Sequence, residues 1–159
     1  MRATRPVFAR VGTCFSLLAW LSAASTPSPL SAADSDVRGW WQEPSGAVIQ
    51  IASCAEGLCL KIVALSGGDH PHNDVHNPDA KLRGRALCGL QIGQHFTQTD
   101  RQHAEGGRLY DPRSGQTYSG SMTAEGNTLK LRGYLGIKLL GRTEIWTRVA
   151  PGQRTCTSA

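Results

Sequence analysis

The amino-acid sequence predicts an all-β fold, an antiparallel up-and-down barrel of about eight strands with only minor helix. After residue 33, apolar and polar residues alternate with a period of two over most of the chain, and turn-forming residues recur at short intervals. No segment there has the length and the 3.6-residue periodicity of a substantial amphipathic helix. So many short antiparallel strands either close into a barrel or fold into a sandwich, and the hairpin spacing of consecutive strands favours the barrel.

Each expected strand is bounded by turn residues. The first is "RGWWQ", and a hairpin follows in which "GAVIQIAS" and "LCLKIVAL" flank the turn "CAEG". After a long polar loop, "LQIGQHFTQT" resumes the sheet. The remaining strands are "GRLYDP" and "QTYSGSMT", which meet at "RSG", and then "NTLKLRGYLG" and "KLLGRTEIWTRV".

The last two strands suggest what lines the interior. Alternate residues of each strand share one face, and one face of each is expected to be buried. We expect a cavity whose walls include Leu129, Leu131, Ile145 or aromatic rings, because a barrel of this size has room for one small ligand. The three glycines of "RGYLGIKLLG" are expected to form bends or bulges at a barrel corner, or else to let a ligand approach the backbone.

Residues 1–33 have the composition of a secretory signal peptide followed by a mobile N-terminus. Three arginines precede the apolar stretch "VGTCFSLLAWLSAA", and small residues follow it in "STPSPLSAADS". Cleavage after Ala24 or after Ala33 fits the small-residue rule, and Ala33 is preferred. The stretch is shorter than the roughly 18 residues of a spanning helix, and no later segment is long or apolar enough to be one. We therefore expect an exported protein, periplasmic or secreted, with residues 34–159 as its single domain.

The net charge argues against a nucleic-acid partner. The whole chain carries a formal charge of +5, but three of its 17 Lys and Arg residues lie in the leader. The remaining 14 face 12 Asp and Glu residues, which leaves a charge near +2. A charge this small is not the basic surface that binds nucleic acid.

Four cysteines remain after the leader, and an even number in an exported chain predicts disulfides. Cys54 and Cys59 flank a short turn that can bring them together across a hairpin, which leaves Cys88 for Cys156. This is the preferred one of three possible pairings. The alternative is a metal site formed by the two nearby cysteines and a histidine from the polar loop.

Five segments in this order resemble a known family of exported bacterial proteins, the domain of unknown function 2147. They are "GWWQ", "SCAEGLCLKIV", "NDVHNPDAKLRGRALCGL", "GGRLYDPRSGQTYSGSM" and "TLKLRGYLGIKLLGRTEIWTRV", and they cover nearly the whole chain after the leader. The resemblance implies a lipocalin-like barrel and an exported protein. It implies no established reaction.

The family pattern also covers part of the polar loop. An acidic residue, Asn-Pro-Asp and a basic "LRxR" segment fall on Asp74, Asn77, Pro78, Asp79, Leu82, Arg83 and Arg85. We expect a turn in which the side-chain oxygens of Asn77 and Asp79 bond backbone amides. The aspartates of the loop are expected to pair with Arg83 and Arg85.

The same loop, "GGDHPHNDVHNPD", contains three histidines that lie outside the family pattern. His70, His72 and His76 could supply three imidazoles, and Asp69 or Asp74 could complete a shell for Zn²⁺ or Cu²⁺. The spacing is not that of a rigid zinc helix. Adventitious binding and a plain solvated loop are the alternatives, and the solvated loop is preferred.

No hydrolase motif is present. The chain lacks the "G-x-S-x-G" elbow, and the serines of "SGSM" lie in an expected strand. Asp111 and Glu144 are the conceivable carboxylate pair, but Asp111 precedes a proline and is read as a turn former. Glu144 is read as a surface partner of Arg142 or Arg148. We therefore expect no catalysis and no cofactor.

The preferred function is non-catalytic binding of a small amphiphilic or apolar molecule inside the barrel. The apolar part would be desolvated in the interior, and an arginine at the rim would hold the polar head. The loop from Gly67 to Asp79 would act as a lid. Two alternatives are a cell-envelope interaction or structural module with a filled interior, whose protein partner the sequence does not indicate, and metal handling by the histidines. The candidate ligand-binding residues are Trp40, Trp41, Arg83, Tyr110, Tyr118, Arg132, Tyr134, Arg142 and Trp146.

Overall fold

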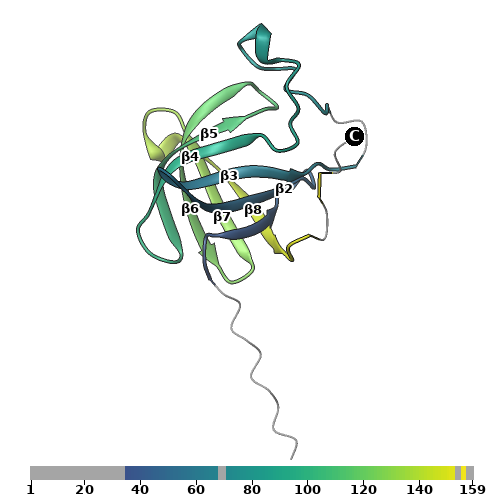
Figure 1. The fold of residues 1–159 in the computed structure, drawn as a ribbon. Coiled ribbons are helices and arrows are strands. Elements are labelled where there is room, and N and C mark those ends of the chain that lie inside the picture. The colour runs from purple at the N-terminus through teal and green to yellow at the C-terminus, as the bar shows by residue number, and fades with distance from the viewer. Residues whose placement is uncertain (1–34, 68–70, 153–154, 157–159) are drawn as a thin grey trace, which may run out of the picture. The chain divides into compact units, whose positions relative to one another are not determined.

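The computed structural model describes residues 35–67, 71–152 and 155–156, so the leader predicted over residues 1–33 lies outside it. Eight strands form one closed barrel in which each strand pairs antiparallel with the next and β8 pairs with β1 (Figure 1). The predicted up-and-down barrel is confirmed. The strands are β1 (Gly39–Gln42), β2 (Val48–Cys54), β3 (Gly57–Ala64), β4 (Gln91–Gln98), β5 (His103–Asp111), β6 (Gln116–Glu125), β7 (Thr128–Tyr134) and β8 (Arg142–Val149), with short 3-10 helices η1 (Ala80–Leu82) and η2 (Lys138–Leu140).

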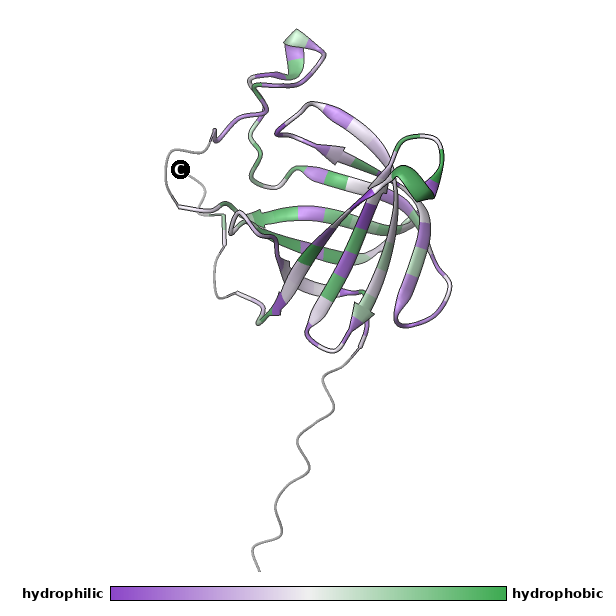
Figure 2. Ribbon diagram, turned by 180° about the vertical axis from the view of Figure 1, so that it is seen from behind, coloured by the Kyte–Doolittle hydropathy of each residue, from purple (hydrophilic) through white to green (hydrophobic). Residues whose placement is uncertain are grey.

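The pairing of β7 with β8 decides which side chains enter the interior. Leu129 and Leu131 of β7 are buried, and their partners in β8 are Trp146 and Glu144. Because directly paired residues point to the same side of a sheet, Trp146 points inward and Ile145 points outward. Ile145 is 50% exposed, so the prediction that it lines a cavity is wrong. Figure 2 shows hydrophobic and hydrophilic residues alternating along the strands.

One half of the barrel interior, which we call the filled end, is packed around Phe96. This side chain of β4 is fully buried. A Cβ atom added at Gly107 would lie 2.2 Å from its ring, and one added at Gly120 would lie 2.7 Å from it. The ring therefore occupies the space that side chains of β5 and β6 would need. The surrounding core includes Trp41, Ile49, Ile51, Leu58, Leu60, Met122, Ala124 and Leu129.

The connections of an up-and-down barrel alternate between its two ends. The β1–β2, β3–β4, β5–β6 and β7–β8 connections, which comprise residues 43–47, 65–90, 112–115 and 135–141, all lie at one end. We call this the open end. The strand connections at the opposite end are the short turns after β2, β4 and β6.

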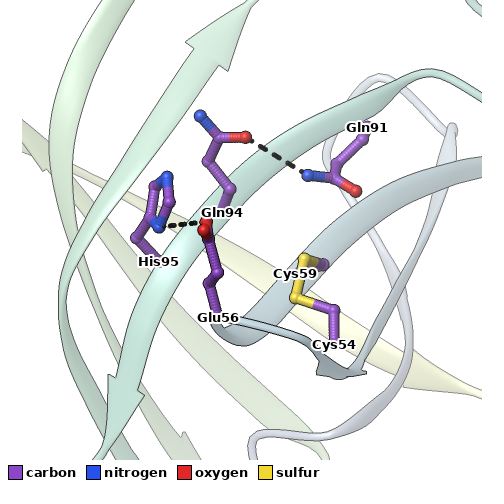
Figure 3. The surroundings of a disulfide bond; sticks show 6 residues. All are labelled: Cys54, Glu56, Cys59, Gln91, Gln94 and His95. Atoms are coloured by element: carbon purple, nitrogen blue, oxygen red, sulfur yellow. Dashed lines mark hydrogen bonds and ion pairs between the residues drawn. A yellow bond between two sulfur atoms is a disulfide. The ribbon is translucent and has the colours of Figure 1, made fainter.

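A disulfide between Cys54 and Cys59 joins β2 to β3 across their turn, with the two Cα atoms 5.9 Å apart (Figure 3). Next to it, the carboxylate oxygen of Glu56 in the turn lies 2.8 Å from Nδ1 of His95 of β4 (Figure 3). The turn is thus tied to the neighbouring strand as well as closed by the disulfide.

The second disulfide joins Cys88 to Cys156, with a Cα–Cα distance of 5.7 Å. The backbone N–H of Cys156 donates to the carbonyl of Val63, 2.6 Å away, so the C-terminal segment lies against β3. Both disulfides join the cysteines that the sequence was expected to pair. The Cys88–Cys156 bond connects residues 68 positions apart, and it fixes the end of the long β3–β4 connection to the C-terminal segment.

Candidate ligand-binding pocket at the open end of the barrel

A cavity of about 730 Å³ lies at the open end of the barrel. Its apolar lining comes from inward positions of the strands and from both ends of the β7–β8 loop. Leu131 and Trp146 are almost completely buried beneath it, at 3% and 2% exposure, and mark where the cavity meets the core. The other apolar lining residues are Ile92, Leu109, Leu135 and Leu140.

Charged side chains gather at the rim of this cavity around Arg113, which lies in the β5–β6 turn. Its guanidinium is 2.9 Å from the carboxylate of Glu144, 3.3 Å from that of Asp111 and 4.0 Å from that of Glu43. Burial lowers the pKa of Arg113, but the three carboxylates outweigh this and raise the pKa above its usual value, so the group stays charged. The cluster contains three carboxylates and one guanidinium and has a net negative charge.

The inward direction of Glu144 differs from the sequence prediction, which made it a surface partner of Arg142 or Arg148. Glu144 lies two residues before the inward Trp146, and the indole N–H donates to its carboxylate at 3.1 Å. Its other partner, Arg113, comes from a turn 31 positions earlier in the chain. The period-two pattern of β8 could have indicated that Glu144 points inward with Trp146. No local pattern indicates Arg113 or Glu43, and the sequence analysis missed both.

The cavity brings together four of the residues that the sequence nominated for ligand binding. These are Tyr118 of β6, Tyr134 of β7, and Arg142 and Trp146 of β8, and Trp146 lies buried at the bottom. Arg113 is already bound by three carboxylates, whereas Arg142 forms no ion pair with any residue of the described chain. Arg142 is therefore the rim cation best placed to meet an anionic group of a ligand.

Three other nominated residues have structural roles outside the cavity. Trp41 is fully buried in the core, where its indole N–H donates to the carbonyl of Val37 and the guanidinium of Arg148 lies 4.0 Å from its ring centroid. Trp40 precedes it on the opposite, outer face of β1. Arg132 points away from the cavity and donates to the carbonyl oxygens of the β7–β8 loop.

Tyr110, also nominated, binds the β3–β4 connection. Its hydroxyl donates to the carboxylate of Asp74 at 2.6 Å, and the same carboxylate accepts from Asn77 at 2.7 Å and from Arg85 at 2.8 Å. Asp74 is completely buried. The expected pairing of a loop aspartate with Arg85 is therefore confirmed, but Arg83 instead donates to the backbone carbonyl of Asn77.

The protonation states of this cluster follow from its contacts. Burial alone would raise the pKa of Asp74, but the hydrogen bonds from Tyr110, Asn77 and Arg85 outweigh it and hold the pKa below its usual value. Burial and the neighbouring carboxylate raise the pKa of Tyr110. Asp74 is thus a carboxylate and Tyr110 a protonated donor at neutral pH, which makes the cluster a stable anchor for the connection.

The expected turn around Pro78 is present in this connection. The side chain of Asn77 accepts from the backbone N–H of Asp79 at 2.9 Å, and the side chain of Asp79 accepts from that of Lys81 at 2.9 Å. The carbonyl of His76 lies against Gly115 in the β5–β6 turn, where an added Cβ atom would be 2.0 Å from it. The connection is therefore packed onto the neighbouring turn.

The histidines give no assembled metal site in the part of the chain that is described. His72 and His76 are exposed, and His70 lies outside the described residues. Among residues 35–67, 71–152 and 155–156, no group of three His, Cys, Asp or Glu side chains is arranged to hold a metal ion. Metal binding by all three histidines stays a prediction.

A smaller cavity of about 290 Å³ lies beneath the β3–β4 connection, against β4 and β5. Asn77 and Pro78 of the connection line it, together with the two arginines Arg85 and Arg108. No residue of 71–79 lines the larger cavity. In this arrangement the connection covers the smaller cavity and leaves the larger one open.

A closed antiparallel barrel with a pocket at one end is a lipocalin-like barrel. A structure search agrees, because the chain is similar to protein HP1028 from the human pathogen Helicobacter pylori, described as belonging to the lipocalin family. The TM-score is 0.66 and the identity 20%, over 73% of this chain and 84% of that one, a likeness that shows the fold alone. No curated protein matches the chain. A family of uncharacterised proteins conserved in bacteria, DUF2147, matches residues 39–148, and the chain belongs to this family. In the described residues, no helix is long and apolar enough to cross a membrane.

Proposed function

We propose that the protein binds a small apolar or amphiphilic molecule in the cavity at the open end of its barrel and does not transform it. The observation that carries this proposal is the cavity itself. Its volume of about 730 Å³ lies within the roughly 300–1,000 Å³ typical of small-molecule sites. Its apolar walls and charged rim match a ligand with an apolar body and a polar head.

Binding would gain most of its free energy from the apolar part. A hydrocarbon or ring system placed against Leu109, Leu131 and Trp146 would leave water, at about 25 cal/mol for each Å² of apolar surface buried. The head group would remain at the rim, where Arg142 offers a cation to a carboxylate or phosphate. The carboxylates around Arg113 would repel a head group placed against them, and would thereby orient it toward Arg142.

The absence of catalysis in this proposal is supported by the rim chemistry. Each of the three carboxylates at the cavity has a guanidinium nearby, and the described lining contains no serine, cysteine, histidine or lysine side chain. A serine, cysteine or lysine nucleophile with an adjacent base, which acyl transfer uses, is therefore not assembled from the described lining residues.

Export is the second part of the proposal. Disulfides persist in oxidising compartments, and two of them in one small domain support a location outside the cytoplasm. The periplasm or the extracellular space, reached through cleavage of a leader within residues 1–33, is the compartment that we propose.

The alternative of a filled interaction module is favoured by one observation, the dense packing around Phe96. This dense packing fills only one half of the barrel interior. Native mass spectrometry of the protein purified from the periplasm, before and after mild organic extraction, separates the two functions. We expect a bound mass in the lipid range that is lost on extraction. An unliganded mass, combined with failure to take up any apolar fluorescent probe, would contradict the binding function and favour the interaction module.

A further inference from the structure

The β7–β8 loop carries the largest concentration of exposed apolar side chains. Seven large apolar residues of the described chain are exposed, and four of them lie between residues 135 and 140. Leu139 and Leu140 are 83% and 78% exposed, and Leu135 and Ile137 are 61% and 59% exposed. Figure 2 shows them as the hydrophobic turn at the upper right of the barrel. Contiguous exposed apolar groups of this kind mark contact sites.

This loop is held in place. The guanidinium of Arg132 donates to the carbonyl of Lys138 at 2.9 and 2.7 Å and to that of Leu139 at 3.1 Å. Lys138 also pairs with Glu105 of β5 at 2.8 Å. Gly141 lies so close to β7 that an added Cβ atom would be 2.6 Å from the carbonyl of Gly133. The apolar side chains are therefore presented outward by a braced backbone.

The loop is continuous with the mouth of the cavity. Leu135 and Leu140 line the cavity, whereas Ile137 and Leu139 do not. The apolar surface thus runs from the inside of the pocket, over its rim, to the tip of the loop. A molecule moving along this surface would stay in apolar contact from the tip to the cavity.

We infer that this loop docks the open end of the barrel onto the surface of a lipid bilayer, so that the pocket exchanges its ligand with the membrane. The inference deepens the proposed function, because it names lipid as the source of the ligand. Burial of the four aliphatic side chains in the interface would provide the attachment, as it does for other peripheral apolar anchors.

The composition of the loop favours a bilayer over a protein partner. Protein interfaces depend on tryptophan, tyrosine and arginine, and leucine is under-represented among the residues that dominate binding. The exposed tip is aliphatic, and one short loop is small beside the roughly 1,000 Å² that a stable protein interface buries. Lys138 is already paired with Glu105, and three carboxylates face two guanidiniums at the adjacent rim. The aliphatic side chains, and not charge, would therefore hold the loop on the bilayer.

Co-sedimentation with vesicles tests the inference. The protein purified from the periplasm is mixed with vesicles of phosphatidylethanolamine and phosphatidylglycerol, or of phosphatidylcholine alone. The variant Ile137→Ser/Leu139→Ser changes only the tip, because neither residue lines the cavity. We expect the wild type to bind both kinds of vesicle, and the variant to bind each of them on the order of tenfold more weakly. Val75→Ser/Leu82→Ser, which removes two exposed apolar residues of the β3–β4 connection, is the matched control and should bind as the wild type does.

Three results would overturn the inference: no binding of the wild type to vesicles, equal binding of the tip variant, or a wild-type dimer in light scattering that the tip variant converts to a monomer. Uptake of an apolar fluorescent probe, measured without vesicles, tests the pocket separately. If the wild type took up the probe but did not bind vesicles, only the docking inference would be wrong. If the wild type bound vesicles but took up no probe, the proposed ligand-binding function would be wrong and the docking inference would stand.

Discussion

Gly120 of β6 and Gly133 of β7 face each other in the sheet. A Cβ atom at Gly120 would lie 2.7 Å from the ring of Phe96, whereas one at Gly133 would have its nearest neighbour, the Cβ atom of Tyr118, at 3.6 Å. Adjacent glycines thus serve opposite purposes. Gly120 makes room for a large side chain from another strand, and Gly133 leaves room that is part of the cavity.

The same change occurs along individual strands. From the filled end toward the open end, the residues after Trp41 and Leu109 on the same face are Glu43 and Asp111. An interior that is apolar and dense at one end becomes charged and hollow at the other. From this contrast we expect the filled end to contribute most of the stability of the barrel, and the open end to carry the proposed site.

The largest difference between the ends is expected from aromatic truncation. Phe96→Ala should lower the free energy of unfolding by about 3–5 kcal/mol, because it removes a fully buried ring and leaves a cavity. Tyr118→Ala at the open end should cost roughly 1–2 kcal/mol, because the half-buried ring borders space that already exists. Urea denaturation with the disulfides intact measures both. Equal losses would mean that the open end is packed as densely as the filled end.

The two disulfides are expected to differ in the same experiment. In the chain-entropy model, replacing Cys88 and Cys156 by serine should cost about 4 kcal/mol, since these residues are 68 positions apart. Replacing Cys54 and Cys59 should cost only about 2 kcal/mol, since their separation is five. The reverse order of denaturation midpoints would contradict the dependence on loop length that this model predicts.

Replacing Asp74, which anchors the β3–β4 connection, should destabilise the protein mainly near that connection. Asp74→Asn leaves the guanidinium of Arg85 without its buried partner and should cost about 3 kcal/mol. Hydrogen exchange should show the loss mainly in residues 71–87. Asn77→Ala, which removes a neutral side chain that donates to Asp74 and accepts from the backbone N–H of Asp79, is the milder comparison at about 2 kcal/mol. Unchanged protection in the Asp74 variant would show that the cluster does not hold the connection.

The same carboxylate predicts a pH dependence. Because the pKa of Asp74 is lower in the folded chain than in the unfolded one, its contribution is fully present above the unfolded value of about 3.9 and is lost as the pH falls through the folded value. The stability difference between the wild type and Asp74→Asn should therefore shrink in acid. If the stability difference between the two proteins stayed constant down to pH 2, the negative charge of Asp74 would not be the source of its stabilising effect.

The smallest pair of effects comes from the two facing glycines. Gly120→Ala should cost about 1–3 kcal/mol through overpacking against Phe96. Gly133→Ala should change the stability by less than about 1 kcal/mol, because its added methyl group meets only ordinary contacts. Thermal unfolding of the two variants measures both costs. If Gly133→Ala destabilised the protein as much as Gly120→Ala does, the interior next to Gly133 would be packed as densely as that next to Gly120.

Much of the fold could be predicted because its signals are local. Period-two alternation located the strands, and a short turn brought Cys54 and Cys59 together. The direction of β8 was harder, because alternation separates Ile145 from Trp146 without saying which of them points inward. That choice depends on the partner strand, where Leu129 and Leu131 are already buried.

The site was predictable only in part. Tyr118, Tyr134 and Trp146, which the sequence nominated, line the cavity, and ligand binding by them stays a prediction. The ionic cluster around Arg113 needs the closed barrel, which brings Glu43 and Glu144 to a turn far from both in sequence. The depth of the cavity depends on how far along the barrel axis the Phe96 ring lies. The residue pattern of a single strand does not encode that position.

Filling the cavity is the sharpest way to test whether the open end binds an apolar or amphiphilic ligand, which is the claim on which the proposed function depends. Gly133→Leu places a large side chain inside the pocket, whereas Gly84→Leu adds the same side chain where nothing lies within 4 Å of the added Cβ atom. Titration with an apolar fluorescent probe should show saturable binding to the wild type and to Gly84→Leu. Binding to Gly133→Leu should be at least about tenfold weaker, with the fold intact by circular dichroism. Equal probe binding by all three proteins would contradict the claim.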